Sequence, residues 1–201
     1  MTKHLAQDLQ ETRKNLFEFF AEFFIGPRTE KLLVNRKAAF DSIVQIAKVL
    51  DMDSSKFQYS EVELDSLSVE QQFARLFYGV GKSTVSMQER SYRSSNLADN
   101  AKNLASLFDL HASAGLMINK DKQGEADSLG LELDFASGLV TMDRDTDLIE
   151  RTLLNRHLFP LARCIQDQAK ALEPCGPVIE VLDALILFLE IEIKLTAVPT
   201  E

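Results

Sequence analysis

The sequence predicts an all-α protein, folded as a single bundle of about seven helices. Its 201 residues include only 8 Gly and 5 Pro, and Leu, Ala, Glu, Gln and Lys are frequent, which favours helix over strand. Apolar residues also recur at helical spacing along most of the chain. Because a chain of this length buries a sizeable core, we expect one domain over residues 1–201. A charged connection at 117–127 could act as a hinge between two lobes of that domain.

Two amphipathic helices are expected at the start of the chain, over about 4–24 and 29–50. The pair Gly26-Pro27 would end the first of them. Its apolar positions are Leu5, Leu9, Leu16, Phe20, Phe23 and Phe24. Those of the second helix are Leu32, Leu33, Phe40, Ile43 and Val44.

Two further helices have recognisable ends. Ser68 to Gln71 fits a capping box at the start of one helix, and Gly79 fits its left-handed stop. Asn96 can cap the next helix, which would end near Gly115. The expected buried side chains are Phe73, Leu76 and Phe77 on the first helix and Leu97, Ala101, Leu104, Phe108 and His111 on the second.

The segment LGLELDF at 129–135 is ambiguous, because it alternates with period two and on its own fits a strand. We interpret it as helix, since it lacks β-branched residues and no second strand candidate exists to pair with it. Asp127 would then be its N-cap.

The last part of the chain predicts two long helices. One runs from about 147 to 172 and is bent or divided at Pro160, since proline removes one backbone donor. The other begins at Pro177, a good first-turn residue, and continues to about 196.

The charge pattern limits the kinds of partner. The net charge is −9 and no basic stripe appears, so we expect no nucleic-acid partner. Acidic residues are concentrated in 121–150. They fit either a solvated face or a docking region for a cationic partner, and composition does not choose between the two.

We expect a cytoplasmic protein that is not inserted in a membrane. The first residues contain no apolar segment typical of a secretory signal. In the most apolar stretch, 178–193, the longest uncharged run is Ala184 to Leu189, whereas a membrane span needs about 20 residues. Cys164 and Cys175 fit two idle thiols in a reducing compartment.

Nothing in the sequence predicts a catalytic, metal or cofactor site. GVGKST at 79–84 fails as a phosphate loop on spacing, because the residue where the first glycine should stand is Leu76, inside an expected helix. The histidines, His4, His111 and His157, lack metal-ligand spacing. We expect His111 to be a core histidine, and for His157 we favour structural packing over a place in a cleft.

Four segments, in this order, carry a resemblance to a known family. They are EQQFARLFYG at 70–79, a serine-containing loop with Glu89, Tyr92 and Ser94, EADSLGLELDF at 125–135, and NRHLFP at 155–160. This order is similar to the redox-enzyme maturation chaperones of the TorD/DmsD/NarJ type. Ser128, Ala126 and Leu161 depart from the family's usual histidine, proline and tryptophan, and the tyrosine loop has lost its prolines. These departures indicate a divergent branch with its own client.

The resemblance implies an all-helical cytoplasmic chaperone rather than an enzyme. It would bind the twin-arginine signal peptide, or the precursor, of a molybdopterin-containing oxidoreductase, and would delay export until the cofactor is inserted. Such a partner needs carboxylates for its arginines and an apolar trough for its hydrophobic stretch. By motif position, the residues expected to bind the signal peptide are Leu76, Phe77, Gly79, Tyr92, Asp127, Ser128 and Glu132.

Two alternatives remain open at this point. One is a NarJ-like assembly factor for a membrane-bound reductase that does not use the export machinery. The other is a small helical, nucleotide-dependent enzyme or regulator that uses the loop from Gly79 to Thr84. The family includes monomers and domain-swapped homodimers, so either state is compatible with the resemblance.

Overall fold

Helices make up most of the described chain, and the all-α prediction is confirmed. A computed structural model describes residues 2–26, 30–55, 57, 59, 65–79, 84–93, 96–142 and 146–197, and these residues form no strand. The α-helices are α1 (Thr2–Ile25), α2 (Glu30–Val49), α3 (Ser66–Phe77), α4 (Arg90–Arg93), α5 (Leu97–Ser113), α6 (Leu129–Val140), α7 (Asp147–Leu153), α8 (Phe159–Leu172) and α9 (Pro177–Ala197). A 3-10 helix spans Lys120–Glu125, and a π-helical turn, Leu154–Leu158, joins α7 to α8.

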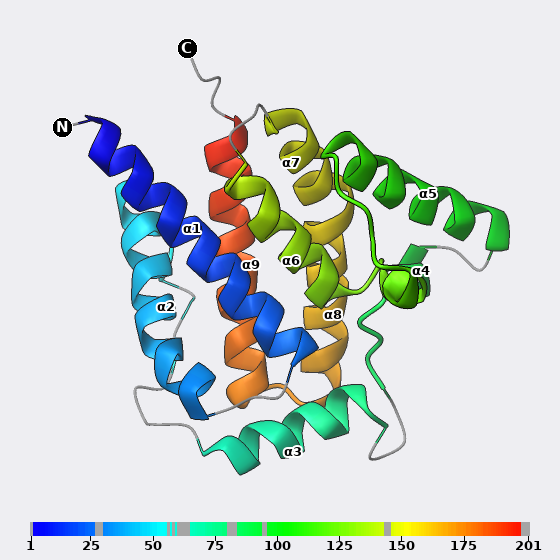
Figure 1. Ribbon diagram of the computed structural model, residues 1–201. Helices are drawn as coiled ribbons and strands as arrows, with labels where there is room; N and C mark the ends of the chain where they lie inside the picture. Colours follow the sequence, from blue (N-terminus) through cyan, green and yellow to red (C-terminus); the bar gives the residue numbers. More distant parts are fainter. Residues whose placement is uncertain are drawn as a thin grey trace.

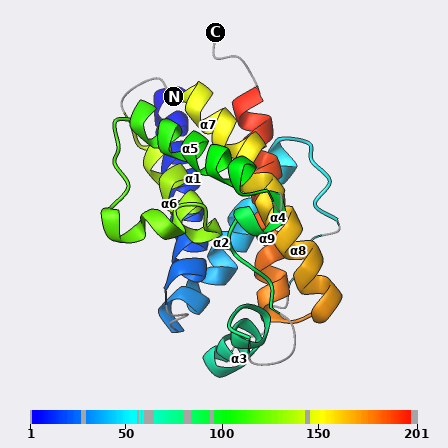
Figure 2. The same ribbon diagram turned by 90° about the vertical axis from the view of Figure 1, so that its right-hand side faces the viewer.

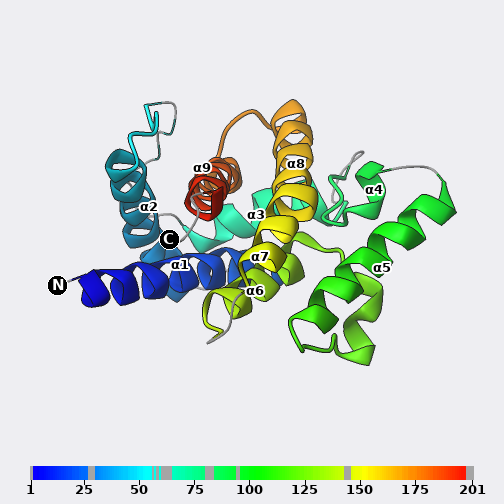
Figure 3. The same ribbon diagram turned by 90° about the horizontal axis from the view of Figure 1, so that it is seen from above.

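The C-terminal helix α9 lies at the centre of the bundle. It packs against α2, α3, α7 and α8, and Figure 3 shows it between α2 and α8. Helices α1 and α6 cross its other side as a second layer, with α3 running across one end (Figure 1). As predicted, α9 begins at Pro177. None of the described helices is long and apolar enough to cross a membrane.

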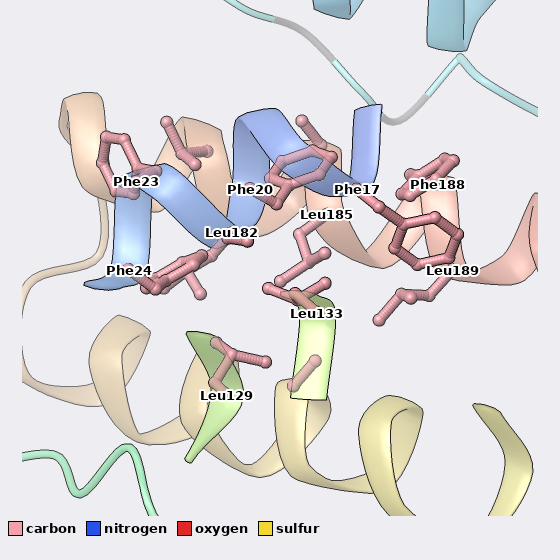
Figure 4. Packing of buried hydrophobic residues seen from close by; sticks show 14 of the residues in the cluster. Phe17, Phe20, Phe23, Phe24, Leu129, Leu133, Leu182, Leu185, Phe188 and Leu189 are labelled. Carbon is pink, nitrogen blue, oxygen red and sulfur yellow. The ribbon is translucent and has the colours of Figure 1, made fainter. Parts of the chain in front are cut away.

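Phenylalanines of α1 join the two layers. The rings of Phe17 and Phe20 lie 4.7 Å and 5.7 Å from the ring of Phe188 on α9. One turn later, the rings of Phe23 and Phe73 lie 6.0 Å apart, which fixes α1 on α3. Figure 4 shows the α1 rings facing the leucines of α6 and α9. Aromatic pairs at these separations add stabilisation beyond the apolar area that they bury.

Helix α6 is buried on both sides, which explains its ambiguous sequence. Leu129, Leu133 and Ala136 are fully buried, and Phe135 on another face is also buried. A helix covered by α1 and by the π-turn region needs apolar residues at most positions, so no helical period stands out. The helical interpretation of 129–135 is confirmed, and the predicted cap Asp127 is wrong: Ser128 is the N-cap, without a side-chain bond.

The predicted helix ends are confirmed in part. Asn96 caps α5 by accepting from the backbone N–H of Ala98 at 2.9 Å, and Gly79 ends α3 with φ +74°. The capping box at Ser68 is wrong. Asp65 caps α3 instead, because its carboxylate reaches the free N–H groups of the first turn at Leu67 and Ser68.

Helix α5 lies at the edge of the molecule, and its predicted stripe is buried only in part. Figure 2 shows it on the outer face. Leu107 is its one fully buried residue, whereas Leu97 is 85% exposed. The stripe expected from the sequence was therefore wrong at Leu97 and Ala101, which are both exposed, although α5 packs against α4 and α7.

The predicted division at Pro160 is confirmed. The chain passes from α7 into α8 through the π-turn, which ends immediately before Phe159. Proline has no N–H to give to the carbonyl group of Arg156, four residues earlier. That carbonyl accepts a hydrogen bond from the guanidinium of Arg93 instead.

The buried apolar residues form one core cluster across these helices. The hinge at 117–127 stays a prediction.

Candidate functional site

The tyrosine loop and the start of α6 are held side by side by backbone hydrogen bonds. The N–H of Glu89 donates to the carbonyl of Asp127 at 2.8 Å, and the N–H of Leu129 donates to the carbonyl of Met87 at 2.9 Å. This short antiparallel contact brings together two of the segments that carry the family resemblance.

Asp127 is fully occupied inside the protein. It is 2% exposed, and its carboxylate accepts from the backbone N–H of Arg90 at 3.0 Å and from the Nε of the same residue at 2.9 Å. The guanidinium also bonds the second carboxylate oxygen. Asp127 therefore anchors the tyrosine loop to α6 and has little capacity left for an outside arginine.

Glu132 is buried without a hydrogen-bond partner in the described part of the chain. It is 1% exposed, and neither of its carboxylate oxygens meets a donor there. Burial raises the pKa of this carboxyl group well above its usual range, and the nearby charges of Glu89 and Asp127 raise it further. The fold thus favours a neutral, protonated Glu132.

A second buried acid, Glu89, is well satisfied. Its Oε2 lies 3.0 Å from Nδ1 of His157 and accepts from Asn103 at 2.6 Å, while its Oε1 accepts from Nε of Arg93 at 2.8 Å. Burial alone would raise the pKa of Glu89, but His157, Arg93 and Asn103 outweigh it and hold this pKa below its usual range. His157 packs in the interior, as expected.

Two hollows flank α6, and Leu131 lines both of them. We call them together the α6 groove. The first, of about 450 Å³, lies between the ends of α1 and α3 and the start of α6, and it includes Ile25, Phe77, Tyr78, Met87, Glu125 and Ser128. The second, of about 440 Å³, lies between α1, α6 and the segment after α5, and it includes Glu18, Met117, Ile118, Asp134 and Phe135.

The α6 groove combines exposed apolar side chains with unpaired carboxylates. Met117 is 97% exposed and Tyr78 is 63% exposed. Glu125 and Asp134 are exposed and make no ion pair within the described residues, whereas Glu18 pairs with Lys14 at 2.6 Å. A groove of this kind can take an apolar segment that carries positive charge.

A sequence model described as the nitrate reductase delta subunit matches residues 35–172. The chain belongs to the nitrate reductase delta subunit family. The resemblance to redox-enzyme maturation chaperones of the NarJ/TorD type is therefore confirmed. No curated protein and no solved structure gives a significant match.

The nitrate reductase delta subunit family consists of molybdoenzyme maturation chaperones, and this protein is one of its members. Proteins of the family are assembly factors rather than enzymes, and they bind redox-enzyme precursors. The match includes α3, α5 and α6, and with them most of the α6 groove.

The residues expected from the family motifs occupy four kinds of position in this family member. Phe77 and Ser128 line the α6 groove. Leu76 belongs to the core at 1% exposure, and its carbonyl accepts from the N–H of Val85 at 2.8 Å. Asp127 and Glu132 are buried and line neither hollow of the groove.

Gly79 and Tyr92 hold the loop between α3 and α4. Gly79 turns the chain at the end of α3, and a side chain there would meet Thr84 at 3.1 Å. The hydroxyl group of Tyr92 donates to the carbonyl of Ser86 at 2.6 Å, and burial raises the pKa of Tyr92 to about 12. The glycine-lysine part of GVGKST, residues 80–83, lies outside the described residues.

Glu125 and Asp134, the two exposed acids of the groove, are not among the site residues predicted from the family motifs. Both belong to the acid-rich stretch 121–150, so the sequence contained a signal, but it did not tell exposed acids from buried ones. Residues two apart in a helix point to different faces, and Glu132 is on a face near Glu89, Asp127 and Arg93, whereas Asp134 lines the second hollow.

Proposed function

We propose that the α6 groove binds the twin-arginine signal peptide of a molybdopterin-containing oxidoreductase precursor in the cytoplasm and delays its export until the cofactor is inserted. The observation that carries this proposal is the pair of exposed carboxylates of Glu125 and Asp134, which make no ion pair within the described residues and lie on a groove with apolar walls. Family membership supports a redox-enzyme precursor as the partner.

The groove suits the chemistry of such a leader. A twin-arginine leader has two adjacent guanidinium groups followed by an apolar stretch that can form a helix. Carboxylates bind guanidinium groups through paired hydrogen bonds, so Glu125 and Asp134 would take the arginines. The apolar stretch would lie against Tyr78, Met87 and Met117, which the groove leaves accessible.

The residues expected from the motifs would have two roles in this arrangement. Phe77 and Ser128 would contact the peptide, because they line the groove. The remaining five do not line the groove and would act by holding α3, the tyrosine loop and the start of α6 in place: Leu76, Gly79, Tyr92, Asp127 and Glu132.

Titration of the full-length protein with the leader of the molybdoenzyme encoded beside its gene tests the proposal. Glu125→Gln and Asp134→Asn should each weaken binding about tenfold, as expected for one charge-assisted hydrogen bond. Asp109→Asn removes an equally exposed acid from α5, outside the groove, and should change the dissociation constant by less than about twofold. Equal effects of all three variants would refute the groove as the site.

Two variants that each remove an apolar side chain test the apolar part of the groove separately. Met117→Ser should weaken binding, because Met117 is almost fully exposed on the groove and its loss leaves the fold intact. Leu148→Ser removes an apolar side chain that is 76% exposed on α7 and does not line the groove, so it should leave the affinity unchanged.

The family description favours a second candidate, a NarJ-like factor that binds a reductase precursor without an export signal. The same titration separates the two functions. If the arginine pair of the leader is changed to glutamine, the export-chaperone function predicts a clear loss of affinity, whereas the assembly-factor function predicts none.

A further inference from the structure

A cavity of about 660 Å³ lies between α5 and the π-turn, and His157 of the Glu89–His157 pair is part of its lining. Its polar and charged lining includes Arg93, Lys102, Asn103, Ser106, Arg156 and His157. None of these six residues belongs to the α6 groove.

The lining of this cavity has a net positive charge, whereas the whole chain has a net negative charge. It holds three cationic side chains, those of Arg93, Lys102 and Arg156, and one exposed acid, Asp99. In four other hollows of the described structure the acids outnumber the cations. In a protein with a net charge of −9, a cationic cavity marks a place where an anion is favoured locally.

Two of the three cations are available to a ligand. Arg93 is engaged, because its guanidinium bonds Glu89 and the carbonyl of Arg156. Lys102 and the side chain of Arg156 are exposed and make no ion pair within the described residues. The cavity therefore presents two solvent-facing cations over a rigid base.

The base of the cavity is built by the π-turn. Asn155, Arg156 and His157 follow one another on that turn, and π-turns are rare and frequently found at functional sites. The ring of His157 is fixed by Glu89, with its Nε2 3.4 Å from the hydroxyl group of Ser106. The hydroxyl group of Ser106 thus lines the same cavity and is paired with His157.

We propose that this cavity binds the phosphate group of a small phosphorylated molecule. Arg156 would bind two phosphate oxygens at once, and Lys102 would add a second positive charge. Two free cations match the charge of a phosphate monoester or diphosphate better than that of a single carboxylate. The volume lies within the range of small-molecule pockets, so it leaves space for more of the ligand than the phosphate.

Titration of the full-length protein with inorganic pyrophosphate at physiological salt tests this site. We expect a dissociation constant of about 1 mM or tighter. Arg156→Gln and Lys102→Gln should each weaken it about tenfold, the effect of one charge-assisted hydrogen bond. Both side chains are exposed, so thermal unfolding of the variants should match that of the parent protein.

Lys31→Gln is the matched control, since Lys31 is an exposed lysine on α2, outside the cavity. It should leave pyrophosphate binding unchanged. No binding up to about 10 mM, or an equal loss in Lys31→Gln, would overturn the proposal. Leader binding should persist in Arg156→Gln and Lys102→Gln. The proposal for the cavity and the proposal for the groove can therefore be refuted independently of each other.

Discussion

At the scale of single residues, Glu132 is the side chain whose chemistry the fold changes most. Its pKa is raised by burial first and then by two neighbouring acids. A group whose pKa is higher in the folded state stabilises the fold below its unfolded pKa, and this stability is lost as the pH rises through the folded pKa. Glu132 should therefore make the protein less stable in alkaline solution than in mildly acidic solution.

Glu132→Gln tests this effect, because glutamine has the shape of the protonated carboxyl group and does not titrate. At about pH 8.5 the variant should be more stable than the parent protein by at least about 1 kcal/mol, since each pKa unit corresponds to about 1.4 kcal/mol. At about pH 5 the difference should be small. Urea unfolding at both pH values measures it.

Asp134→Asn is the control for this comparison, because Asp134 is an exposed acid on the same helix. Its effect on stability should be small at both pH values. A gain for Glu132→Gln that is the same at pH 5 and pH 8.5 would show that the carboxyl group is not held protonated.

The residue scale is also where the sequence was least informative. Of the residues taken from the motif positions, Phe77 and Ser128 line a common hollow beside the start of α6. The pairing of Asp127 with Arg90 was not readable, since 37 residues separate them and either could have met solvent. A charged side chain can be buried when an oppositely charged partner pairs with it. Residues close to it in the sequence do not show whether such a partner exists.

At the scale of elements, the contact between α1 and α6 depends on a glycine. A Cβ atom added at Gly130 would lie 2.5 Å from Cγ1 and 3.2 Å from the backbone nitrogen of Ile25. The two helices can approach this closely only because the position carries no side chain. At Gly138, on the same helix, a Cβ atom would meet nothing within 4 Å.

Gly130→Val should push α1 away from α6 and destabilise the fold by about 2 kcal/mol, the cost of overpacking a tight contact. Gly138→Val introduces the same side chain where its Cβ atom meets no neighbour within 4 Å, so the gain in helix propensity should leave stability unchanged or slightly higher. Thermal unfolding of the two variants measures the difference. Similar losses in both would mean that helix propensity, not the helix contact, governs the effect.

The elements themselves were largely predictable, because helical period and caps are local properties. The helix starts at Asn96 and Pro177 and the stop at Gly79 needed only neighbouring residues. The predicted stripe of α5 failed at Leu97 for the opposite reason: whether an apolar residue is covered depends on how far other helices extend. The spacing of apolar residues predicts which face of a helix is apolar, but it does not predict which other helices cover that face.

At the scale of the whole molecule, one cation joins both ends of the chain. Arg13 on α1 donates to Glu192 on α9, with Nε–Oε1 and Nη2–Oε2 distances of 3.0 Å and 2.6 Å, and it also bonds Glu150 on α7. Glu192 is fully buried and Glu150 is 4% exposed. The partners lie 137 and 179 residues from Arg13, so nothing local in the sequence predicted this network.

Arg13→Met should destabilise the fold by roughly 3 kcal/mol or more at neutral pH, because it leaves two buried carboxylates without their cation. Burial already raises the pKa of Glu192 and of Glu150, and without Arg13 both pKa values should rise further. The folded variant would then bind protons that the unfolded chain releases, so its stability should fall as the pH rises. The loss should be smaller at about pH 5 than at about pH 8.

The neighbouring Lys14 supplies the control. Its pair with Glu18 is exposed on both sides, so Lys14→Met should cost less than about 0.5 kcal/mol and show no such pH dependence. Adding Glu192→Gln to Arg13→Met should recover part of the lost stability, because it removes one of the stranded charges. If the double variant is no more stable than Arg13→Met, the packing of the Arg13 side chain rather than its charge holds α1, α7 and α9 together.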